Sequence, residues 1–117
     1  MPIIKVVGIF YYKISVETNI IIRMKQRLTR TFFTKPTLWV AKAMLGKYLV
    51  RKIGNRTLAG KIVETEAYIG PYDRASHAYG GRVTERNRAE WLIGGHIYIY
   101  LVYGMYWQLN ISTGKDG

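Results

Sequence analysis

The order of apolar and polar residues along the chain predicts one helix followed by several strands. A helix is expected over residues 37–47, because four apolar side chains would share one of its sides: Leu38, Ala41, Met44 and Leu45. Thr37 can cap this helix and Gly46 can end it. Two-residue alternation predicts four strands, over residues 48–53, 58–69, 96–102 and 106–112.

Shorter signals connect these elements. Gly54-Asn55 is typical of a hairpin turn, and residues 103–105 predict a second turn between the last two strands. The Gly- and Arg-rich stretch over residues 70–95 contains a possible short helix at 85–92. The strands on either side of these turns are therefore expected to run antiparallel.

The first 23 residues differ from the rest. Their apolar, β-rich runs are too short and too interrupted to span a membrane, and they lack the basic start and cleavage site of a secretory signal. Met24 opens a segment that reads as a natural start. We expect residues 1–23 to be an N-terminal extension and residues 24–117 to hold the domain, with a genuine N-terminal hairpin as the open alternative.

Composition narrows the class of protein. The 117 residues suffice for one domain, and the net charge of +11 favours a polyanionic partner, either nucleic acid or an anionic membrane surface. A basic surface that serves only solubility is the alternative. The chain has no cysteine, which excludes disulfides and thiolate metal sites, and only His77 and His96 offer imidazoles. We expect no metal and no cofactor.

Two of the seven acidic residues lie in the sequence KIVETEAYIG, within a predicted strand. Alternation places Ile62, Glu64, Glu66 and Tyr68 on one face and leaves residues 63, 65, 67 and 69 as a plain core face. Because a buried carboxylate without partners is costly, the first face must meet water, donors or a cavity. The alternative is a partly exposed strand whose acids pair with Arg or Lys.

Two further segments favour nucleic acid. Gly80-Gly81 is followed by three guanidinium groups suited to phosphates, on Arg82, Arg86 and Arg88, although a solvated basic loop would read the same way. In residues 96–110, Tyr98 and Tyr100 share a strand face and Tyr103 stands at the turn. An aromatic side chain on a hairpin tip can enter a duplex and unstack bases, while a core-packing tyrosine is the plainer reading.

Several of these segments together resemble the alkyladenine (3-methyladenine) DNA glycosylase family of the mammalian type. The resemblance runs from about residue 30 to the end and rests on VAKAMLGKYLV, GKIVETEAYIGPYDRASHAYGGRVTERNR and GHIYIYLVYGMYWQLNIS. An ETEAY motif, a later His, an Arg-Asn block and Y-x-x-Y-G-M before an Asn form a highly specific combination.

The resemblance implies a role for each motif residue. Glu66 would be the general base that activates water, Tyr103 would fill the gap left by a flipped nucleotide, and Glu64 receives no role. Three arginines would hold the DNA backbone: Arg82, Arg86 and Arg88. Four residues would form the base-binding pocket: Tyr68, His77, Tyr100 and Asn110.

The resemblance also implies an activity and a fold. The expected enzyme is a base-excision repair glycosylase that flips alkylated or deaminated purines (3-methyladenine, 7-methylguanine, hypoxanthine) from double-stranded DNA and hydrolyses the N-glycosidic bond, leaving an abasic site. No lysine lies within the motif, so we expect a monofunctional enzyme. The implied fold is α+β: a mixed, mainly antiparallel curved sheet, a few helices and a protruding β-hairpin, in a single, incomplete domain. We expect a monomer that binds no membrane, in the cytoplasm or nucleoid of a bacterium or the nucleus of a eukaryote.

Departures from the family pattern leave alternatives. Glu90-Trp91 stands where the family usually has an apolar pair, and Gly94 replaces a usual proline, so we expect a looser approach to the hairpin. Residues 24–117 would be the N-terminal part of the catalytic domain, and an inactive basic nucleic-acid-binding fragment is the rival reading. A sugar glycosidase using Glu64 and Glu66 is disfavoured, because acids on one strand face do not flank a substrate.

Overall fold

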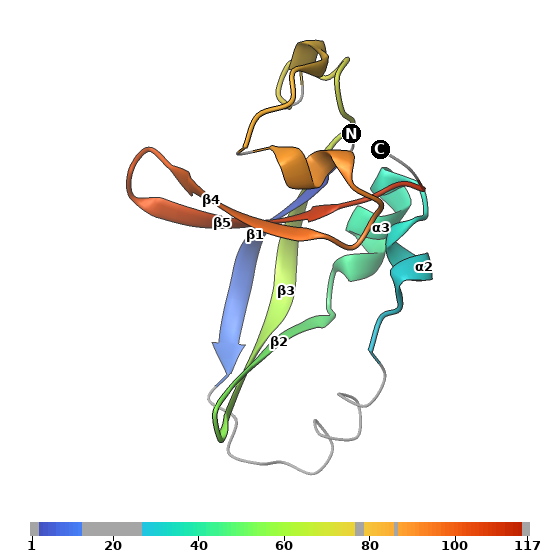
Figure 1. The fold of residues 1–117 in the computed structure, drawn as a ribbon. Helices are drawn as coiled ribbons and strands as arrows, with labels where there is room; N and C mark the ends of the chain where they lie inside the picture. The colour runs from blue at the N-terminus through green and yellow to red at the C-terminus, as the bar shows by residue number, and fades with distance from the viewer. Residues whose placement is uncertain (1–2, 13–26, 77–78, 86, 116–117) are drawn as a thin grey trace.

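The computed structural model describes residues 3–12, 27–76, 79–85 and 87–115. Its elements in chain order are β1 (Ile3–Tyr12), α2 (Arg30–Phe33), α3 (Thr37–Met44), β2 (Tyr48–Ile53), β3 (Arg56–Tyr68), the 3₁₀ helices η1 (Tyr79–Gly81) and η2 (Arg88–Trp91), β4 (Ile97–Val102) and β5 (Tyr106–Ser112) (Figure 1). The four predicted strands are confirmed: β2 and β5 have the predicted boundaries, and those of β3 and β4 differ by one or two residues.

The strands form one five-stranded sheet in the order β2-β3-β1-β5-β4. Every pairing among the described strands is antiparallel. Figure 1 shows the β4–β5 hairpin projecting sideways from a sheet that curves strongly between β3 and β5. The α+β prediction, with its mainly antiparallel curved sheet and protruding hairpin, is confirmed.

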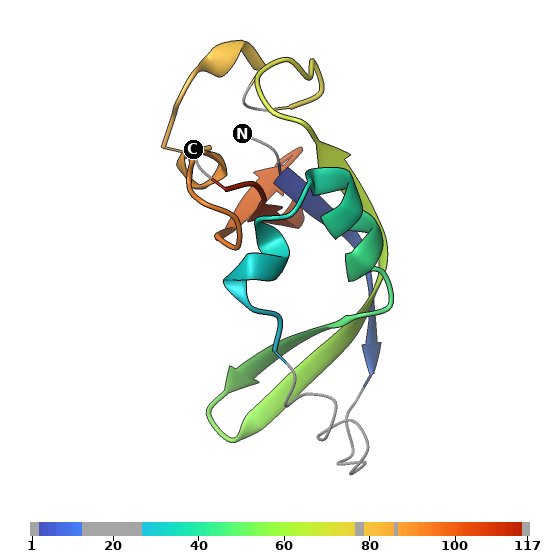
Figure 2. The ribbon, with the colours of Figure 1, turned by 90° about the vertical axis from the view of Figure 1, so that its right-hand side faces the viewer.

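Helix α3 covers one face of this sheet, and packs on β3 and β1 (Figure 2). It ends at Met44, three residues earlier than predicted, and Gly46 follows with a φ of +81° that suits glycine. Thr37 is the first helical residue and not the cap; its hydroxyl is bonded to that of Thr113 at 2.8 Å. The helix buries Val40, Ala41 and Met44 against the sheet.

The core side of the sheet forms a row across four strands. Ala67 pairs with Ile4, Ile4 with Ile111, and Ile111 with Ile97. Because opposed residues in antiparallel strands point to the same face, this row lies beneath α3. Ile4 and Ile111 are fully or almost fully buried, whereas Ile97, beyond the reach of the helix, is half exposed.

Strict alternation along β3 fails near its middle. Ile62, predicted on the same face as Glu64 and Glu66, belongs to the hydrophobic core, and Val63, predicted in the core, is exposed. The pairing of β1 with β3 shifts register on both sides of Gly8, which lies opposite Glu64. Such an irregularity reverses which alternate residues face inward, so the prediction is right for residues 64–68 and wrong for residues 62–63.

The early part of the chain contributes to this sheet. Strand β1, within the predicted extension of residues 1–23, lies between β3 and β5. Much of the remainder of the proposed extension falls outside the described residues. The division of the chain at residue 23 stays a prediction. Within the residues described, no helix has the length and hydrophobicity needed to span a bilayer.

The segment that leads into β4 is tightly held. The Gly94 N–H donates to the Gly114 carbonyl at 2.9 Å, and a side-chain carbon on Gly94 would lie 2.2 Å from the Phe33 carbonyl oxygen. Ser112 is fully buried, and its hydroxyl accepts a hydrogen bond from the His96 N–H at 3.0 Å. The predicted loosening at Gly94 is therefore wrong, because glycine allows the backbones to approach closely there.

Candidate active site

A row of polar residues crosses the sheet next to the core row. Glu66 on β3 lies opposite Lys5 on β1, Lys5 lies opposite Asn110 on β5, and Asn110 lies opposite Tyr98 on β4. Tyr68 and Tyr100 are each two positions along their strands from this row and point the same way. We call this side of the sheet the tyrosine face, defined by Glu66, Tyr68, Tyr98, Tyr100 and Asn110.

The Glu66 carboxylate is held in place by its neighbour on the strand. The Tyr68 hydroxyl donates a hydrogen bond to Glu66 Oε2 at 2.6 Å, and both side chains are half-buried. This bond, burial, and the charges of Glu66 and Asp73 raise the pKa of Tyr68 to about 12. Tyr68 therefore stays protonated at neutral pH and keeps donating to the carboxylate.

Tyr98 makes the second hydroxyl–carboxylate contact of the tyrosine face. Its hydroxyl donates to Glu90 Oε1 at 2.5 Å, and Glu90, in η2, is fully buried. Burial, and then the bond to Glu90 and its charge, raise the pKa of Tyr98 far above its ordinary value. Weaker electrostatic contributions from Tyr100 and Tyr68 act in the same direction. Tyr68, Tyr98 and Tyr100 therefore lie near one another on the tyrosine face.

Two other predicted pocket residues lie on this face. Asn110 is 4% exposed, and its side-chain amide donates to the Gln108 carbonyl at 3.3 Å. Tyr100 is half-buried and lies opposite Gln108 on β5. His77, the remaining predicted pocket residue, lies outside the described residues. The structure thus brings together four of the five residues assigned to the base or its hydrolysis: Glu66, Tyr68, Tyr100 and Asn110.

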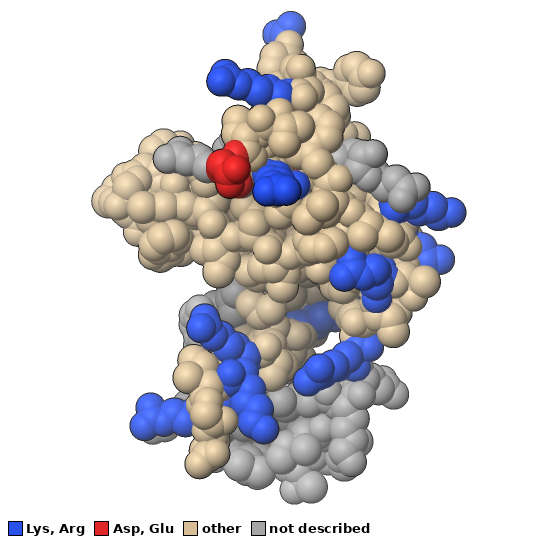
Figure 3. All heavy atoms as spheres, in the orientation of Figure 1, with Lys and Arg blue, Asp and Glu red and all other residues tan. Residues whose placement is uncertain are grey.

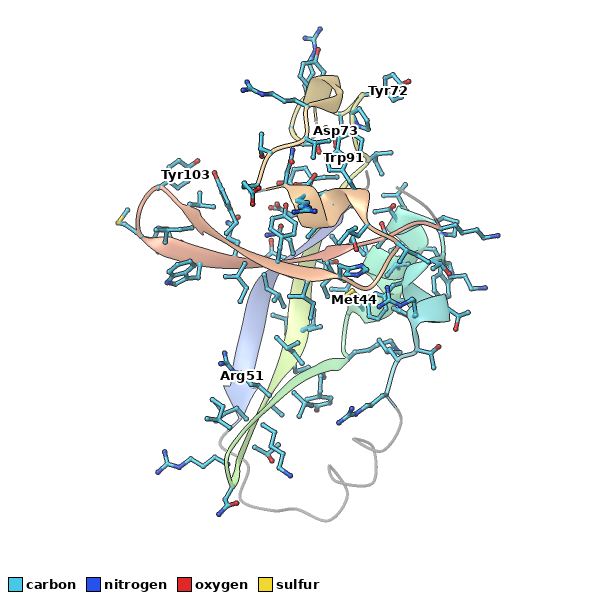
Figure 4. All side chains as sticks on the ribbon, viewed as in Figure 1. Met44, Arg51, Tyr72, Asp73, Trp91 and Tyr103 are labelled. Atoms are coloured by element: carbon cyan, nitrogen blue, oxygen red, sulfur yellow. The ribbon has the colours of Figure 1, made fainter. Side chains whose placement is uncertain are left out.

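Tyr103 occupies the tip of the β4–β5 hairpin (Figure 4). Its side chain is 86% exposed. The φ of Tyr103 is +54° and that of Gly104 is +66°, as in a type I′ turn. The Met105 N–H donates a hydrogen bond to the Val102 carbonyl at 3.1 Å, which completes the turn. A tyrosine with positive φ is uncommon and is a strained conformation of the kind found at functional sites.

The predicted phosphate-binding arginines lie on the loop beyond the tyrosine face. Arg82 and Arg88 are exposed, and Arg86 falls outside the described residues. In the space-filling view of Figure 3, Lys and Arg atoms greatly outnumber Asp and Glu atoms on the visible face. The basic side chains project from the lower end, where β2 and β3 meet, from the right-hand side, beside α2 and α3, and from the loop at the top of the view (Figure 3).

Sequence reasoning missed the residue that holds this loop together. Asn87 is 3% exposed; its Oδ1 accepts from the Thr84 N–H at 2.6 Å and its Nδ2 donates to the Arg82 carbonyl at 2.8 Å. Asp73 has a similar role one loop earlier, where its two carboxylate oxygens accept from the Ile69 and Ala75 N–H groups. Asp73 could have been identified from its place in the Gly- and Pro-containing turn GPYD, whereas no Gly or Pro lies near Asn87 in RVTERNRAEW.

The other missed contact is that of Glu90 with Tyr98. Glu90 was noted only as a departure from an apolar pattern, and Tyr98 only as a partner of Tyr100. No local pattern joins a 3₁₀ helix residue to a strand residue eight positions later. Glu64 receives no role from the structure either: its side chain is exposed and it lies opposite Gly8.

An open depression of about 820 Å³ lies beside the tyrosine face. The residues that line it are Pro71, Tyr72, Arg74, Tyr79, Gly80, Gly81 and Trp91, of which Tyr72 and Trp91 are labelled in Figure 4. None of the described residues of the tyrosine face lines it. The geometry of the hydroxyl–carboxylate pairs, and not this depression, therefore marks the candidate site.

Comparisons with known proteins agree with this arrangement. A family model for methylpurine-DNA glycosylase (MPG) matches residues 31–117. A Clostridium perfringens protein that carries a 3-methyladenine DNA glycosylase name is 57% identical over 91 residues, covering 77% of this chain and 44% of that protein. The human DNA-3-methyladenine glycosylase is 51% identical over 92 residues, covering 78% of this chain and 31% of the human protein.

The chain thus spans less than half the length of the curated relatives named above. The match includes all the residues that form the tyrosine face and the tip of the hairpin. On the extent of that match, the chain belongs to the methylpurine-DNA glycosylase family.

Proposed function

We propose that the protein carrying this chain is a monofunctional DNA glycosylase that removes alkylated or deaminated purines during base-excision repair. Membership of the methylpurine-DNA glycosylase family supports this activity. The observation that carries it is the Glu66 carboxylate, held at 2.6 Å by the Tyr68 hydroxyl on a face that also presents Tyr100 and Asn110. The proposed substrates are 3-methyladenine, 7-methylguanine and hypoxanthine in double-stranded DNA.

In the proposed reaction, Glu66 accepts a proton from water. The water oxygen forms a bond to C1′ of the sugar, the N-glycosidic bond breaks, and the purine leaves with the bonding electrons. Alkylation gives a purine a positive charge that makes it a better leaving group, so a placed water and a base are the main requirements. General base catalysis of this kind contributes roughly 10²–10⁴-fold.

The aromatic residues offset the cost of flipping the nucleotide. Extrusion of a base costs a few kcal/mol, and less when the base is damaged, while stacking on a ring contributes about 1–3 kcal/mol per base. Tyr68 and Tyr100 are the proposed stacking residues, with His77 beside Tyr68. Tyr103 would occupy the gap in the duplex, and its exposure at the hairpin tip supports that role.

The remaining parts of the proposal concern selectivity and context. Asn110, almost fully buried on the tyrosine face, would crowd the exocyclic amino group of normal guanine. Arg82, Arg86 and Arg88 would contact backbone phosphates, consistent with the net charge of +11. We propose a monomeric protein that works where the genome is, in the cytoplasm or nucleoid of a bacterium or the nucleus of a eukaryote.

The test of this function uses the full-length protein that carries the sequence. Unmodified protein should release hypoxanthine or an alkylated purine from duplex DNA and leave abasic sites. The variant Glu66→Gln should lose release by at least 10²-fold, in line with the loss of a general base, yet still bind lesion DNA. Base release is measured in single-turnover reactions and binding by fluorescence anisotropy.

Glu64→Gln is the matched control, since Glu64 is an exposed acid on the same strand and has no proposed role. It should release bases at the unmodified rate. Normal excision by Glu66→Gln would show that the base is another residue. Salt-sensitive DNA binding without any release by the unmodified protein would favour the rival reading, a non-catalytic nucleic-acid-binding protein.

A further inference from the structure

A second carboxylate contacts the proposed base-binding face, at the Tyr98 hydroxyl. Glu90 is fully buried, and its Oε1 accepts a hydrogen bond from the Tyr98 hydroxyl at 2.5 Å. The reaction proposed above uses Glu66 alone and gives Glu90 no part. Because burying a carboxylate is costly, the presence of Glu90 beside this face calls for a reason.

The position of Tyr98 connects this carboxylate to the tyrosine face. Tyr98 lies opposite Asn110 and shares its strand face with Tyr100. Glu90 is therefore joined by one hydrogen bond to the face that would hold a flipped purine.

We propose that Glu90, acting through Tyr98, is a specificity-determining residue that favours purines carrying positive charge over neutral purines. The inference rests on the proposed function and adds to it a preference within the substrate class. Glu90 does not contact the base; it acts through the Tyr98 hydroxyl, and Glu66 keeps the chemical role.

The proposal takes Glu90 as ionised, the form that accepts the Tyr98 O–H, and this charge would produce the preference through two physical effects. A negative charge excluded from water attracts a cation several ångströms away more strongly than the same charge at the surface, because the medium between them screens less. A phenol that donates to a carboxylate also places more electron density on its ring, which strengthens cation–π attraction. A neutral purine gains little from either effect.

The deciding experiment measures binding of the full-length protein in a Glu66→Gln background, where the lesion base stays attached. Two duplexes of identical sequence are compared, one with 7-methylguanine, which is cationic, and one with hypoxanthine, which is neutral. Adding Glu90→Gln removes the charge and keeps an oxygen that can accept from Tyr98. The ratio of affinities, cationic over neutral, should fall by about tenfold.

Two further variants make the result specific. Tyr98→Phe keeps the Glu90 carboxylate and removes its hydrogen bond to the tyrosine face, so the ratio of affinities should fall several-fold. If Glu90→Gln does not fold, Tyr98→Phe is the variant that tests the proposal. Glu85→Gln removes an exposed acid from the same segment and should leave the ratio unchanged. Thermal melts establish that each variant compared is folded.

The proposal is overturned if the ratio of affinities is unchanged in Glu90→Gln. Where Glu90→Gln does not fold, an unchanged ratio in Tyr98→Phe overturns it. An equal loss of affinity for both lesions would do the same, since a purely structural role for Glu90 affects both alike. Failure of the proposed function is a separate result: the unmodified protein then releases neither base, whereas the binding ratio reports on Glu90 without requiring release.

Discussion

At the scale of single residues, the candidate site depends on two tyrosine hydroxyls that each donate to a carboxylate. Tyr68 holds Glu66 at 2.6 Å and Tyr98 contacts Glu90 at 2.5 Å. The first pair is half-buried and open to a water molecule, while Glu90 is fully buried. The same pairing of a tyrosine and a carboxylate therefore occurs in two environments. Only the more open pair, Tyr68 and Glu66, suits proton transfer from water.

The Glu66–Tyr68 pair predicts how stability depends on pH. The pKa of Tyr68 is raised from 10.0 to about 12, with the hydrogen bond to Glu66 as its largest cause. A raised pKa means that this contribution to the free energy of unfolding is complete below pH 10 and is lost as pH rises toward 12. In Glu66→Gln the pKa of Tyr68 should fall toward 10.0, as measured by NMR titration of the tyrosine ring carbons. A titration midpoint that does not move would show that the bond is not the main cause.

Tyr103 predicts a separation of stability from DNA binding. A non-glycine residue in the left-handed region costs on the order of 1 kcal/mol or more, and Tyr103 is 86% exposed, so its ring adds little packing. Tyr103→Gly should therefore unfold at the same denaturant concentration or higher, while Tyr103→Ser keeps the strain. Both variants of the full-length protein should bind lesion duplexes more weakly. If nonspecific, salt-sensitive binding falls equally, Tyr103 is not the inserted residue.

At the scale of elements, the parts around the site are joined by close backbone approaches and buried polar side chains. Gly94 brings the start of β4 against Phe33 of α2, where no side-chain carbon fits. Asn87 ties the two ends of the loop that presents Arg82 and Arg88. These contacts fix loops that lack a hydrophobic core of their own.

The Asn87 contacts predict a measurable loss of stability. Asn87→Ala would remove two part-buried hydrogen bonds, from the Thr84 N–H and to the Arg82 carbonyl, at a cost of about 1–3 kcal/mol in the free energy of unfolding. Asn55→Ala, at an exposed asparagine in the β2–β3 turn, should cost less than about 0.5 kcal/mol. Urea denaturation compares the two. Equal costs would mean that the Asn87 bonds are not what stabilises the loop.

At the scale of the whole molecule, the sheet has one polar side and one apolar side. The apolar side is covered by a helix in one part and is exposed to solvent in another. Helix α3 covers the core row near Ile4 and Ile111 and packs mainly on β3 and β1. On the hairpin's own apolar side, four large side chains are 40–72% exposed: Ile97, Ile99, Leu101 and Trp107. The adjoining strand β4 is the last in the sheet order and has one unpaired edge among the described strands.

This exposed stripe predicts weak self-association of the 117-residue chain at high concentration. A contiguous apolar surface beside an open strand edge favours contacts between copies. Ile99→Lys should lower the average mass seen by sedimentation velocity at high concentration. Val83→Lys changes an isolated exposed residue and should leave that mass unchanged. A strictly monomeric chain at all concentrations would contradict the prediction.

Local patterns were enough to place most of the elements, because helices and strands depend on residues close in sequence. The helix at Thr37–Met44 and the hairpin carrying Tyr103 followed from spacing and turn residues. The family resemblance, and not spacing, separated Glu66 from Glu64. Contacts between distant elements could not be predicted this way: the position of β1 between β3 and β5, the register shift that moves Ile62 into the core, and the bond from Tyr98 to Glu90.

The conformation of the hairpin tip has a consequence for the speed of the proposed recognition step. Tyr103 is already extended from a closed turn before any duplex is present. Its insertion would require no rearrangement of the loop, so less conformational freedom is lost on association. The slow event in forming the complex would then lie in the DNA, and the rate should depend on how easily a given base pair opens and little on the protein.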